Sequence, residues 1–326
     1  MSLPETLGDA AFRRKSLLGT NVESTYAGAL SFMRRLYTRD LTGVDVAVSG
    51  IPYDLAVTNR PGTRFGPEAI RKASAQNAWG PIWPWNFDPF DTLAVIDYGD
   101  CNYDHGNPAS IPHSIEEHAD GILAKDVSML TFGGDHFVSY PLLKAHAKKH
   151  GPLAFIQFDA HRDMDVDEES RIDHGTMFKL AIDDGIIDPA KSIQVGIRTS
   201  SPEGQSFGVN ILHADFVHDK GTEAVVNEIK RVVGDAKTYM TFDIDCLDPA
   251  FAPGTGTPVP GGLSTYQALA ILRRLTDVNF VGADIVEVAP AYDQSEITAL
   301  AAAMIAAEYL CILATQKGAK GYTLAP

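Results

Sequence analysis

The stretch LAFIQFDAHRD at residues 153–163 joins a short apolar run to a group of polar side chains. Residues 153–158 do not alternate between apolar and polar types, as a strand with one wet face would. Such a run is typical of a strand that is buried on both faces of a parallel sheet. The stretch therefore predicts a buried strand whose carboxyl end carries Asp159, His161 and Asp163.

Runs of this kind recur along the chain and alternate with helical patterns. The other predicted strands cover residues 45–50, 93–97, 128–132, 192–197, 208–212, 238–242 and 279–284, and the predicted helices cover residues 67–75, 115–125, 141–149, 222–233 and 265–275. Such alternation favours a mainly parallel sheet with helices on both faces. We therefore predict a single three-layer α/β/α domain with a mainly parallel central sheet at residues 41–326, after an N-terminal arm at residues 1–40.

The composition narrows the class of partner. The chain has 326 residues, of which 45% are hydrophobic, and its formal net charge is −15. The sequence has no stripe of Lys and Arg that would neutralise phosphates, so we expect no nucleic-acid partner. An acidic field favours small cationic ligands, although a merely solvated acidic surface would give the same net charge.

Cysteine usage and hydropathy indicate a cytoplasmic protein without a membrane partner. Cys101, Cys246 and Cys311 are odd in number and widely spaced, which favours neither a disulfide framework nor a thiolate zinc site. A reducing compartment fits this pattern. The N-terminus has no apolar segment of the signal-peptide type. The apolar residues 297–313 include Glu308, which predicts a packed helix rather than a membrane span.

The polar group that follows residues 153–158 has the spacing of a metal site. In an extended segment the side chains at positions i, i+2 and i+4 share one face, which places Asp159, His161 and Asp163 together and Arg162 on the opposite face. Two carboxylates and an imidazole that converge at a strand end require a cation or stay unpaired. A solvated acidic turn is the alternative interpretation.

Two more strand ends carry residue types that bind metals. His136 follows Gly133 and Gly134, which allow a tight turn and a close approach of the backbone. Asp243 and Asp245 share one face by the same period of two. The three motifs supply two imidazoles and four carboxylates, a set that suits hard or borderline divalent ions and Mn²⁺ above all. Six ligands exceed one zinc site with an open position, and they fit two ions that share bridging carboxylates.

A fourth group of residues suits a substrate better than a metal. Glu287 ends a late strand, and its carboxylate can hold a planar guanidinium through a bidentate pair. His174 lies in the loop after the second motif, and an imidazole can move protons to a leaving amine near neutral pH. From chemistry alone, a Glu287 paired with a structural Arg and a His174 in a capping turn are equally good interpretations.

The three metal motifs resemble the signature motifs of the ureohydrolases, the arginase–agmatinase family. The resemblance extends over nearly the whole chain, and residues 85–88 and 288–302 look closest to bacterial agmatinases. The motifs that carry it lie at residues 61–71, 133–136, 159–163, 173–178, 243–258 and 287–293. The resemblance implies an arginase-like form of the α/β/α fold, two Mn²⁺ ions per subunit, and a homo-oligomer that is a trimer or a hexamer.

The resemblance also implies a role for each site residue. A hydroxide that bridges the two ions would attack the guanidinium carbon, Glu287 would orient the guanidinium, and His174 would carry protons and contact the substrate. The implied reaction is the hydrolysis of agmatine to putrescine and urea, a step of polyamine biosynthesis. The implied metal ligands are His136 and Asp163 for one ion, His161 and Asp245 for the other, and Asp159 and Asp243 as bridges.

The loop after the second metal motif indicates the chemistry of the substrate tail. Its acidic residues outnumber the basic residues Arg162 and Arg171. An acidic rim favours a cationic tail, as in agmatine, and opposes a carboxylate, although each exposed charge contributes only about 1 kcal/mol or less. Asp165 is the candidate residue for binding the tail. The acidic residues of the loop are Asp165, Asp167, Glu168 and Glu169.

Three alternatives are compatible with parts of this pattern. Arg162 or Arg171 can hold a carboxylate, which would make the protein a guanidino-acid hydrolase acting on 4-guanidinobutyrate or 3-guanidinopropionate. A non-catalytic relative that binds a guanidine or a polyamine would have lost a metal ligand, but all six positions carry the expected residue types. A two-metal phosphoesterase would need a basic phosphate clamp, which the motifs lack, and Glu287 would repel its substrate.

Overall fold

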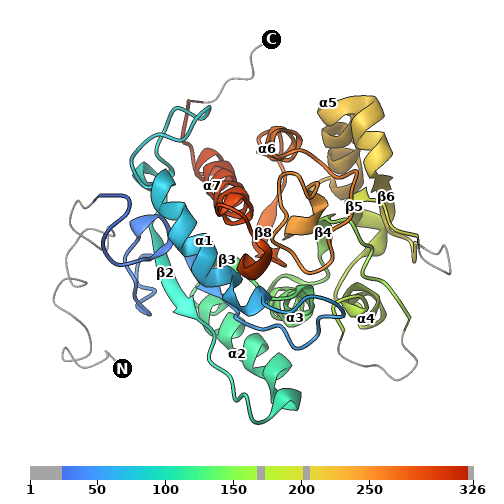
Figure 1. The fold of residues 1–326 in the computed structure, drawn as a ribbon, viewed down its shortest axis with the longest axis horizontal. Coiled ribbons are helices and arrows are strands. Elements are labelled where there is room, and N and C mark those ends of the chain that lie inside the picture. Colours follow the sequence, from blue (N-terminus) through green and yellow to red (C-terminus); the bar gives the residue numbers. More distant parts are fainter. Residues whose placement is uncertain (1–23, 167–172, 201–205, 322–326) are drawn as a thin grey trace.

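The apolar runs form one eight-stranded sheet in the computed structural model, which describes residues 24–166, 173–200 and 206–321 (Figure 1). All pairings between neighbouring strands are parallel, and the strand order is β2-β1-β3-β8-β7-β4-β5-β6. Each apolar run of the sequence corresponds to one strand. The strands are β1 Val46–Gly50, β2 Val95–Asp100, β3 Ser128–Phe132, β4 Ala154–Phe158, β5 Ile193–Ile197, β6 Asn210–His213, β7 Thr238–Asp243 and β8 Phe280–Val286.

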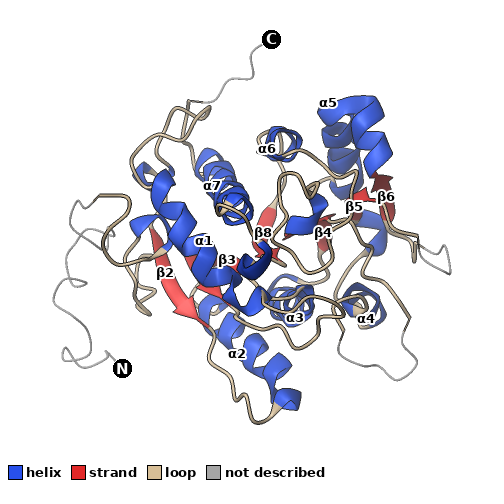
Figure 2. Ribbon diagram, in the orientation of Figure 1, coloured by secondary structure: helices blue, strands red, loops and turns tan. Residues whose placement is uncertain are grey.

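Helices cover both faces of this sheet (Figure 2). Val46 and Val48 of β1 enter one hydrophobic core, whereas Ala47 between them enters the other. Because successive residues of a strand point to opposite faces, a sheet covered on both sides needs apolar residues throughout. This arrangement confirms the predicted three-layer α/β/α fold. The helices of the first core are α1 Gly66–Ser74, α5 Ala214–Val233, α6 Thr265–Leu272 and α7 Ile297–Gln316, and those of the second are α2 Ile111–Leu123, α3 Ser139–His150 and α4 Met177–Asp183.

The helices differ most from the sequence prediction at α4 and α5, whereas the ends of the other predicted helices differ by up to four residues. The sequence pattern does not predict α4, because this short helix buries only Met177, Phe178 and Ala181. α5 begins at Ala214 rather than at residue 222, since Gly221, whose φ is 79°, joins two helical segments. Neither difference changes the order of the layers.

α7 has the length and the apolar composition of a membrane-crossing helix. In the structure, however, 78% of its most apolar window is buried inside the protein. Glu308 near its middle is fully buried and accepts hydrogen bonds from Nε of Arg273 at 2.8 Å and Nε1 of Trp85 at 2.5 Å. A buried carboxylate that is paired in this way fits a helix packed within a protein core, as the sequence predicts.

The described part of the predicted N-terminal arm contributes to the core. Phe32 and Met33 are fully buried, and the backbone N–H of Phe32 donates to Oδ2 of Asp97 at 2.8 Å. Tyr37 forms an isolated parallel bridge with Asp97. The domain boundary at residue 40 stays a prediction, and residues 1–23 lie outside the described part of the chain.

The four central strands of the sheet position the candidate site. β3, β8, β7 and β4 are consecutive neighbours and all run in the same direction. Their carboxyl ends therefore lie at one edge of the sheet, where ligands of α/β proteins bind. His136, Glu287 and Asp159 follow the ends of β3, β8 and β4, and Asp243 is the last residue of β7.

Candidate metal centre

The turn after β3 requires both of its glycines. A Cβ atom added to Gly134 would lie 1.6 Å from the carbonyl oxygen of Tyr53, and one added to Gly133 would lie 2.6 Å from Cγ1 of Val286. The backbone N–H of Asp135 donates to the Tyr53 carbonyl at 2.8 Å, which fixes the turn against the neighbouring loop. This close packing places His136 at the sheet edge in a fully buried position.

His136 lies at the centre of a first group of candidate ligands. Its Nδ1 is 3.1 Å from Oδ2 of Asp159, 3.0 Å from Oδ2 of Asp163 and 3.2 Å from Oδ2 of Asp243. The four ligand atoms all lie within 4.8 Å of one another. Residues from three separate strand ends are therefore close enough to share one ion.

A second group adjoins the first. Nδ1 of His161 lies 3.0 Å from Oδ2 of Asp245 and 3.5 Å from Oδ1 of Asp159. Asp159 thus faces His136 with one carboxylate oxygen and His161 with the other. The backbone N–H of Ala160 donates to Oδ1 of Asp245 at 3.1 Å, so that the loops after β4 and β7 hold each other in place.

The carboxylates of the first group repel one another. Burial and the nearby charge of Asp159 raise the pKa of Asp163 to about 7. Burial and the charges of Asp245 and Asp159 raise the pKa of Asp243 well above its usual value. Buried carboxylates of like charge become stable as anions when a cation lies between them.

The donor set fits a pair of metal ions. Within the described ranges, Nδ1 of His136 is a buried nitrogen without a hydrogen-bond partner, although three carboxylate oxygens surround it. An imidazole lone pair and carboxylate oxygens on one side, and His161 with Asp245 on the other, are a suitable donor set for two hard or borderline divalent cations. The structure therefore supports a binuclear metal site, as the sequence predicts.

Glu287 lies beside the metal site with its two oxygens in different environments. Oε1 accepts the backbone N–H of His136 at 2.9 Å and lies 2.9 Å from Nδ1 of His174. Oε2 is buried, and no described residue provides it with a hydrogen-bond partner. Since both lone pairs of Oε1 are used, Oε2 is the oxygen left to accept a further hydrogen bond, and the bidentate pair with a guanidinium stays a prediction.

His174 is held between Glu287 and the loop before α1. The backbone N–H of Thr58 donates to Nε2 of His174 at 3.1 Å, so Nε2 carries a lone pair and Nδ1 carries the hydrogen that Glu287 accepts. The Thr58 hydroxyl also lies 2.7 Å from Nε2. Burial opposes a charge on the ring, but the hydrogen bond and charge of Glu287 outweigh it and raise the pKa of His174 to about 9.

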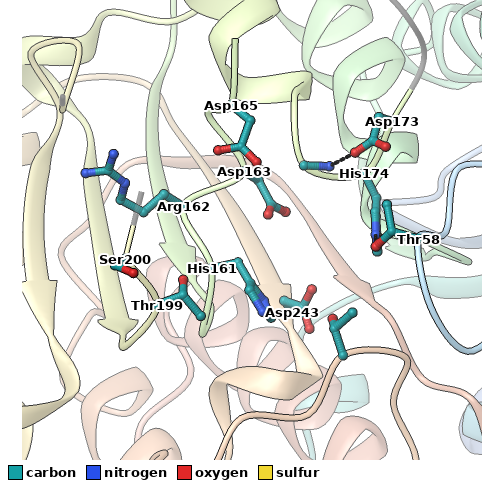
Figure 3. Close-up of a pocket in the computed structure, with 12 residues that line it drawn as sticks. Thr58, His161, Arg162, Asp163, Asp165, Asp173, His174, Thr199, Ser200 and Asp243 are labelled. Atoms are coloured by element: carbon teal, nitrogen blue, oxygen red, sulfur yellow. Dashed lines mark hydrogen bonds between the residues drawn. The ribbon is translucent and has the colours of Figure 1, made fainter. Parts of the chain in front are cut away.

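A cavity of about 240 Å³ opens between these groups (Figure 3). Thr58 and His174 lie on one side, and Arg162 and Ser200 lie on the opposite side. Asp165 also lines the cavity, so one acidic and one basic candidate for the substrate tail are present. The other loop residues of that expectation, Asp167, Glu168, Glu169 and Arg171, lie outside the described residues.

Two residues that the sequence analysis does not single out support the site. Thr58 contacts His174 across 116 positions of the chain. The guanidinium of Arg198 donates to the carbonyls of Asp245 at 2.6 Å and Val259 at 2.7 Å, and so fixes the loop after β7. A single sequence carries no spacing signal for such contacts, because both partners come from separate loops.

The fold and the two ligand groups define the class to which this protein belongs. It is an α/β protein with a binuclear metal site at the carboxyl edge of a parallel sheet. Residues 44–311 match the model of the arginase family, and the chain belongs to this family.

Several relatives share this fold over most of their length. The agmatinase of Chromobacterium violaceum is 61% identical over 312 residues, which are 95% of this chain and 96% of the relative. The crystal structure of a hypothetical agmatinase from Burkholderia thailandensis is 58% identical and has a TM-score of 0.92, covering 96% of this chain and 99% of the other. Proclavaminate amidino hydrolase from Streptomyces clavuligerus is 39% identical with a TM-score of 0.84, covering 90% of this chain and all (100%) of the other. The family fold is therefore shared by proteins named for different substrates.

Proposed function

We propose that this protein is a manganese-dependent agmatinase, which hydrolyses agmatine to putrescine and urea. The relative from Chromobacterium violaceum is named an agmatinase. The observation that carries the proposal is the buried, unpartnered Oε2 of Glu287 beside the metal site. A fixed carboxylate oxygen of this kind is suited to the guanidinium of the substrate, because a charge-assisted hydrogen bond compensates its burial.

The ligand roles follow the two groups of the structure. When bound, two Mn²⁺ ions would supply Lewis acidity and lower the pKa of a water molecule so that it attacks as hydroxide near neutral pH. Asp159 supports the bridging role, because its two oxygens face the two different histidines. For Asp243, only Oδ2 faces His136, while Oδ1 accepts the backbone N–H of Asp245 at 2.8 Å. The proposed ligands are His136 and Asp163, His161 and Asp245, with Asp159 and Asp243 as bridges.

Glu287 orients the head of the substrate in this proposal. Its backbone N–H donates to the carbonyl of Gly134 at 2.8 Å, and two donors hold its Oε1. Oε2 then accepts one N–H of the guanidinium and keeps the guanidinium carbon beside the metal site. Holding the reacting atoms in place contributes to catalysis because the entropy of alignment is lost on binding rather than at the transition state.

His174 delivers the proton that the leaving amine needs. Its Nδ1–H is held by Glu287, so exchange with the cavity takes place at Nε2. The Thr58 hydroxyl lies 2.7 Å from Nε2 and also lines the cavity. The raised pKa of His174 favours a doubly protonated ring, in which Nε2–H donates to Oγ1 of Thr58 and no longer accepts the Thr58 backbone N–H. That proton passes to Oγ1 of Thr58 while the Thr58 hydroxyl proton passes to the leaving nitrogen. The C–N bond breaks with its electron pair on that nitrogen, which departs as the amine.

The tail of the substrate distinguishes the proposal from its runner-up. Asp165 in the cavity wall favours the distant ammonium of agmatine. Arg162 lines the same cavity and has a buried Nε without a hydrogen-bond partner among the described residues, which is the feature that favours a guanidino acid. Proclavaminate amidino hydrolase has the same fold and is named for a different substrate, so the fold alone does not decide between these two tails.

Urea release from four substrates tests the proposal. The Mn²⁺-loaded protein is given agmatine, 4-guanidinobutyrate, 3-guanidinopropionate and L-arginine side by side, and kcat/KM is measured for each. We expect agmatine to be preferred by about a hundredfold or more, a difference of about 2.7 kcal/mol. A preferred guanidino acid would assign the tail to Arg162. No urea from any of the four, with metal bound, would favour the non-catalytic guanidine- or polyamine-binding alternative.

The setting of the enzyme follows from the same proposal. Agmatine hydrolysis would supply putrescine for polyamine biosynthesis in the cytoplasm. The three cysteines, Cys101, Cys246 and Cys311, are free and buried, as we expect of a protein that is kept in a reducing compartment. The homo-oligomer, a trimer or a hexamer, stays a prediction that light scattering of the purified protein would test.

A further inference from the structure

A cluster of buried hydroxyl groups lies behind His136, on the side away from the carboxylates. Asp284 of β8 is fully buried at its centre. Its Oδ1 accepts a hydrogen bond from Oγ1 of Thr241 at 2.6 Å, and its Oδ2 accepts hydrogen bonds from Oγ of Ser139 at 2.8 Å and from the Tyr239 hydroxyl at 2.9 Å. Oγ1 of Thr241 also lies 2.8 Å from Nε2 of His136. The cluster therefore connects a buried carboxylate to a metal-ligand imidazole through one hydroxyl.

The direction of each hydrogen bond in this cluster is fixed. An ionised carboxylate only accepts, so Ser139, Tyr239 and Thr241 each use their single hydroxyl hydrogen on Asp284. The Thr241 oxygen can then only accept a hydrogen from His136. Nε2 of His136 must therefore be the protonated nitrogen of the ring.

The opposite nitrogen then carries the lone pair. Nδ1 is the atom that lies 3.0 to 3.2 Å from three carboxylate oxygens without a hydrogen bond to any of them. A hydrogen on Nδ1 would have been directed at one of these acceptors, whereas a lone pair there requires a cation. The hydrogen-bond directions behind the ring and the three carboxylate oxygens around Nδ1 thus lead to the same tautomer.

We propose that Thr241 and Asp284 are positioning residues that fix the tautomer of His136 and thereby set the affinity of the first metal ion. Carboxylate groups that orient a metal-binding histidine through its second nitrogen usually contribute ten- to a hundredfold to metal affinity. Here the carboxylate acts through an intervening threonine. The inference rests on the metal site of the proposed function and is independent of which guanidino compound is the substrate.

The Mn²⁺ affinity of three variants tests the inference. Thr241→Val keeps the shape of the side chain but leaves Nε2–H of His136 without a hydrogen-bond acceptor. The tautomer with the hydrogen on Nδ1 then becomes more stable relative to the Nε2 tautomer, and that hydrogen occupies the lone pair that the metal needs. We expect calorimetric titration to give a dissociation constant for the tighter ion that is about ten- to a hundredfold higher than in the wild type. Thr241→Ser retains the hydroxyl and should stay within about threefold of the wild type.

Tyr239→Phe is the matched control. It removes one of the three donors to Asp284 but leaves the contact between Thr241 and His136 intact, so its Mn²⁺ affinity should also stay within about threefold. A Thr241→Val protein that binds Mn²⁺ as tightly as the wild type would overturn the inference. An equal loss of affinity in Tyr239→Phe would also overturn it, because a general loss of packing would then be the cause.

A second measurement tests the tautomer of His136 directly, and it applies even if Thr241→Val does not fold. Nitrogen chemical shifts of metal-free wild-type protein, labelled with ¹⁵N at histidine and assigned with His136→Asn, report which ring nitrogen is protonated. Burial opposes a charge on the ring, but the surrounding carboxylates raise the pKa of His136, so the shifts are measured at a pH where the ring is neutral. We expect the single hydrogen of the neutral ring on Nε2, and a neutral ring with its hydrogen on Nδ1 refutes the tautomer. Both experiments are independent of urea release, so they remain decisive if the wild type hydrolyses none of the guanidino substrates.

Discussion

Glu287→Gln is the sharpest test of how the substrate head is held. Oε1 of Glu287 accepts hydrogen bonds from the His136 backbone and from His174, so the amide oxygen of glutamine will occupy that position. The amide nitrogen must then replace Oε2, the atom proposed to accept from the guanidinium. The variant therefore keeps the contacts inside the protein and places a donor against a donor in the complex.

The cost of this change can be worked out from the burial of the pair. Glu287 is 1% exposed, so solvent screens the lost interaction weakly. Loss of one partner from a buried, hydrogen-bonded charge pair costs about 2–5 kcal/mol. A central value of about 3–4 kcal/mol corresponds to a decrease of kcat/KM for agmatine by roughly 160- to 900-fold. Metal content should not change, because the side chain of Glu287 touches the ligands only through the His136 backbone.

Urea release and metal analysis of the same preparation give the result. Glu296→Gln serves as the control, since Glu296 is an exposed glutamate whose side chain pairs with Lys72, and it should keep full activity. A decrease of less than about tenfold in Glu287→Gln, with both ions retained, would refute the role at the substrate head. A parallel loss of metal would mean that Glu287 supports the metal site instead.

Three further predictions concern other parts of the molecule. His161→Ala and Asp245→Ala each remove a side chain of the second ligand group, so both should lose most urea release and one of the two ions by metal analysis; retention of two ions and full turnover would contradict the ligand assignment. Thr58→Val should lower kcat about a hundredfold, within the range of general acid–base groups, whereas Thr58→Ser should stay within about threefold; equal losses in the two variants would indicate a packing role. Burial lowers the pKa of His146 from its unfolded value of about 6.5 to about 4. Between these two values His146 is protonated in the unfolded chain and neutral in the folded protein. As the pH falls from 6.5 to 4, the free energy of unfolding of the metal-free protein should therefore decrease by about 3 kcal/mol through this residue. Denaturant unfolding of wild type and His146→Gln at several pH values measures that difference, and identical pH slopes would exclude it.

The sequence predicts the fold well because burial on both faces leaves a clear mark. β1, β4, β5 and β7 are buried along their whole length, so their centres are evident without reference to their neighbours. The edge strand β6 is only partly buried. The end of β2 is less evident, since the strand continues through Tyr98, Gly99 and Asp100. α4 leaves too short a pattern, because seven residues make only two turns.

The sequence predicts which side chains lie close together at the site, but not the backbone conformation that brings each of them there. The structure brings together the six residues proposed as ligands, and their roles stay a prediction. The period of two holds only at the start of the motif after β4, because Asp163 has a left-handed backbone with φ 51° and lies in a turn. Proximity of Asp163 to His136 therefore comes from the turn rather than from an extended segment.

Sequence patterns do not predict contacts between loops that are far apart in the chain. Thr58 and His174 are separated by 116 positions, and the three donors to Asp284 come from α3 and β7. Neither arrangement has a fixed spacing in the chain. Such contacts depend on which strands become neighbours in the sheet, which a single sequence does not specify.

The four central strands separate two tasks that an enzyme designer would wish to change independently. The ends of β3, β8, β7 and β4 hold the candidate ligands and Glu287, whereas Asp165 lies past the last ligand of the loop that follows β4. Arg162 stands between the ligands His161 and Asp163. Substitution of Asp165 would alter the wall of the cavity while the candidate metal ligands keep their anchors at the ends of the central strands. The wall of the cavity and the candidate metal ligands can thus be changed separately at Asp165, but not at Arg162.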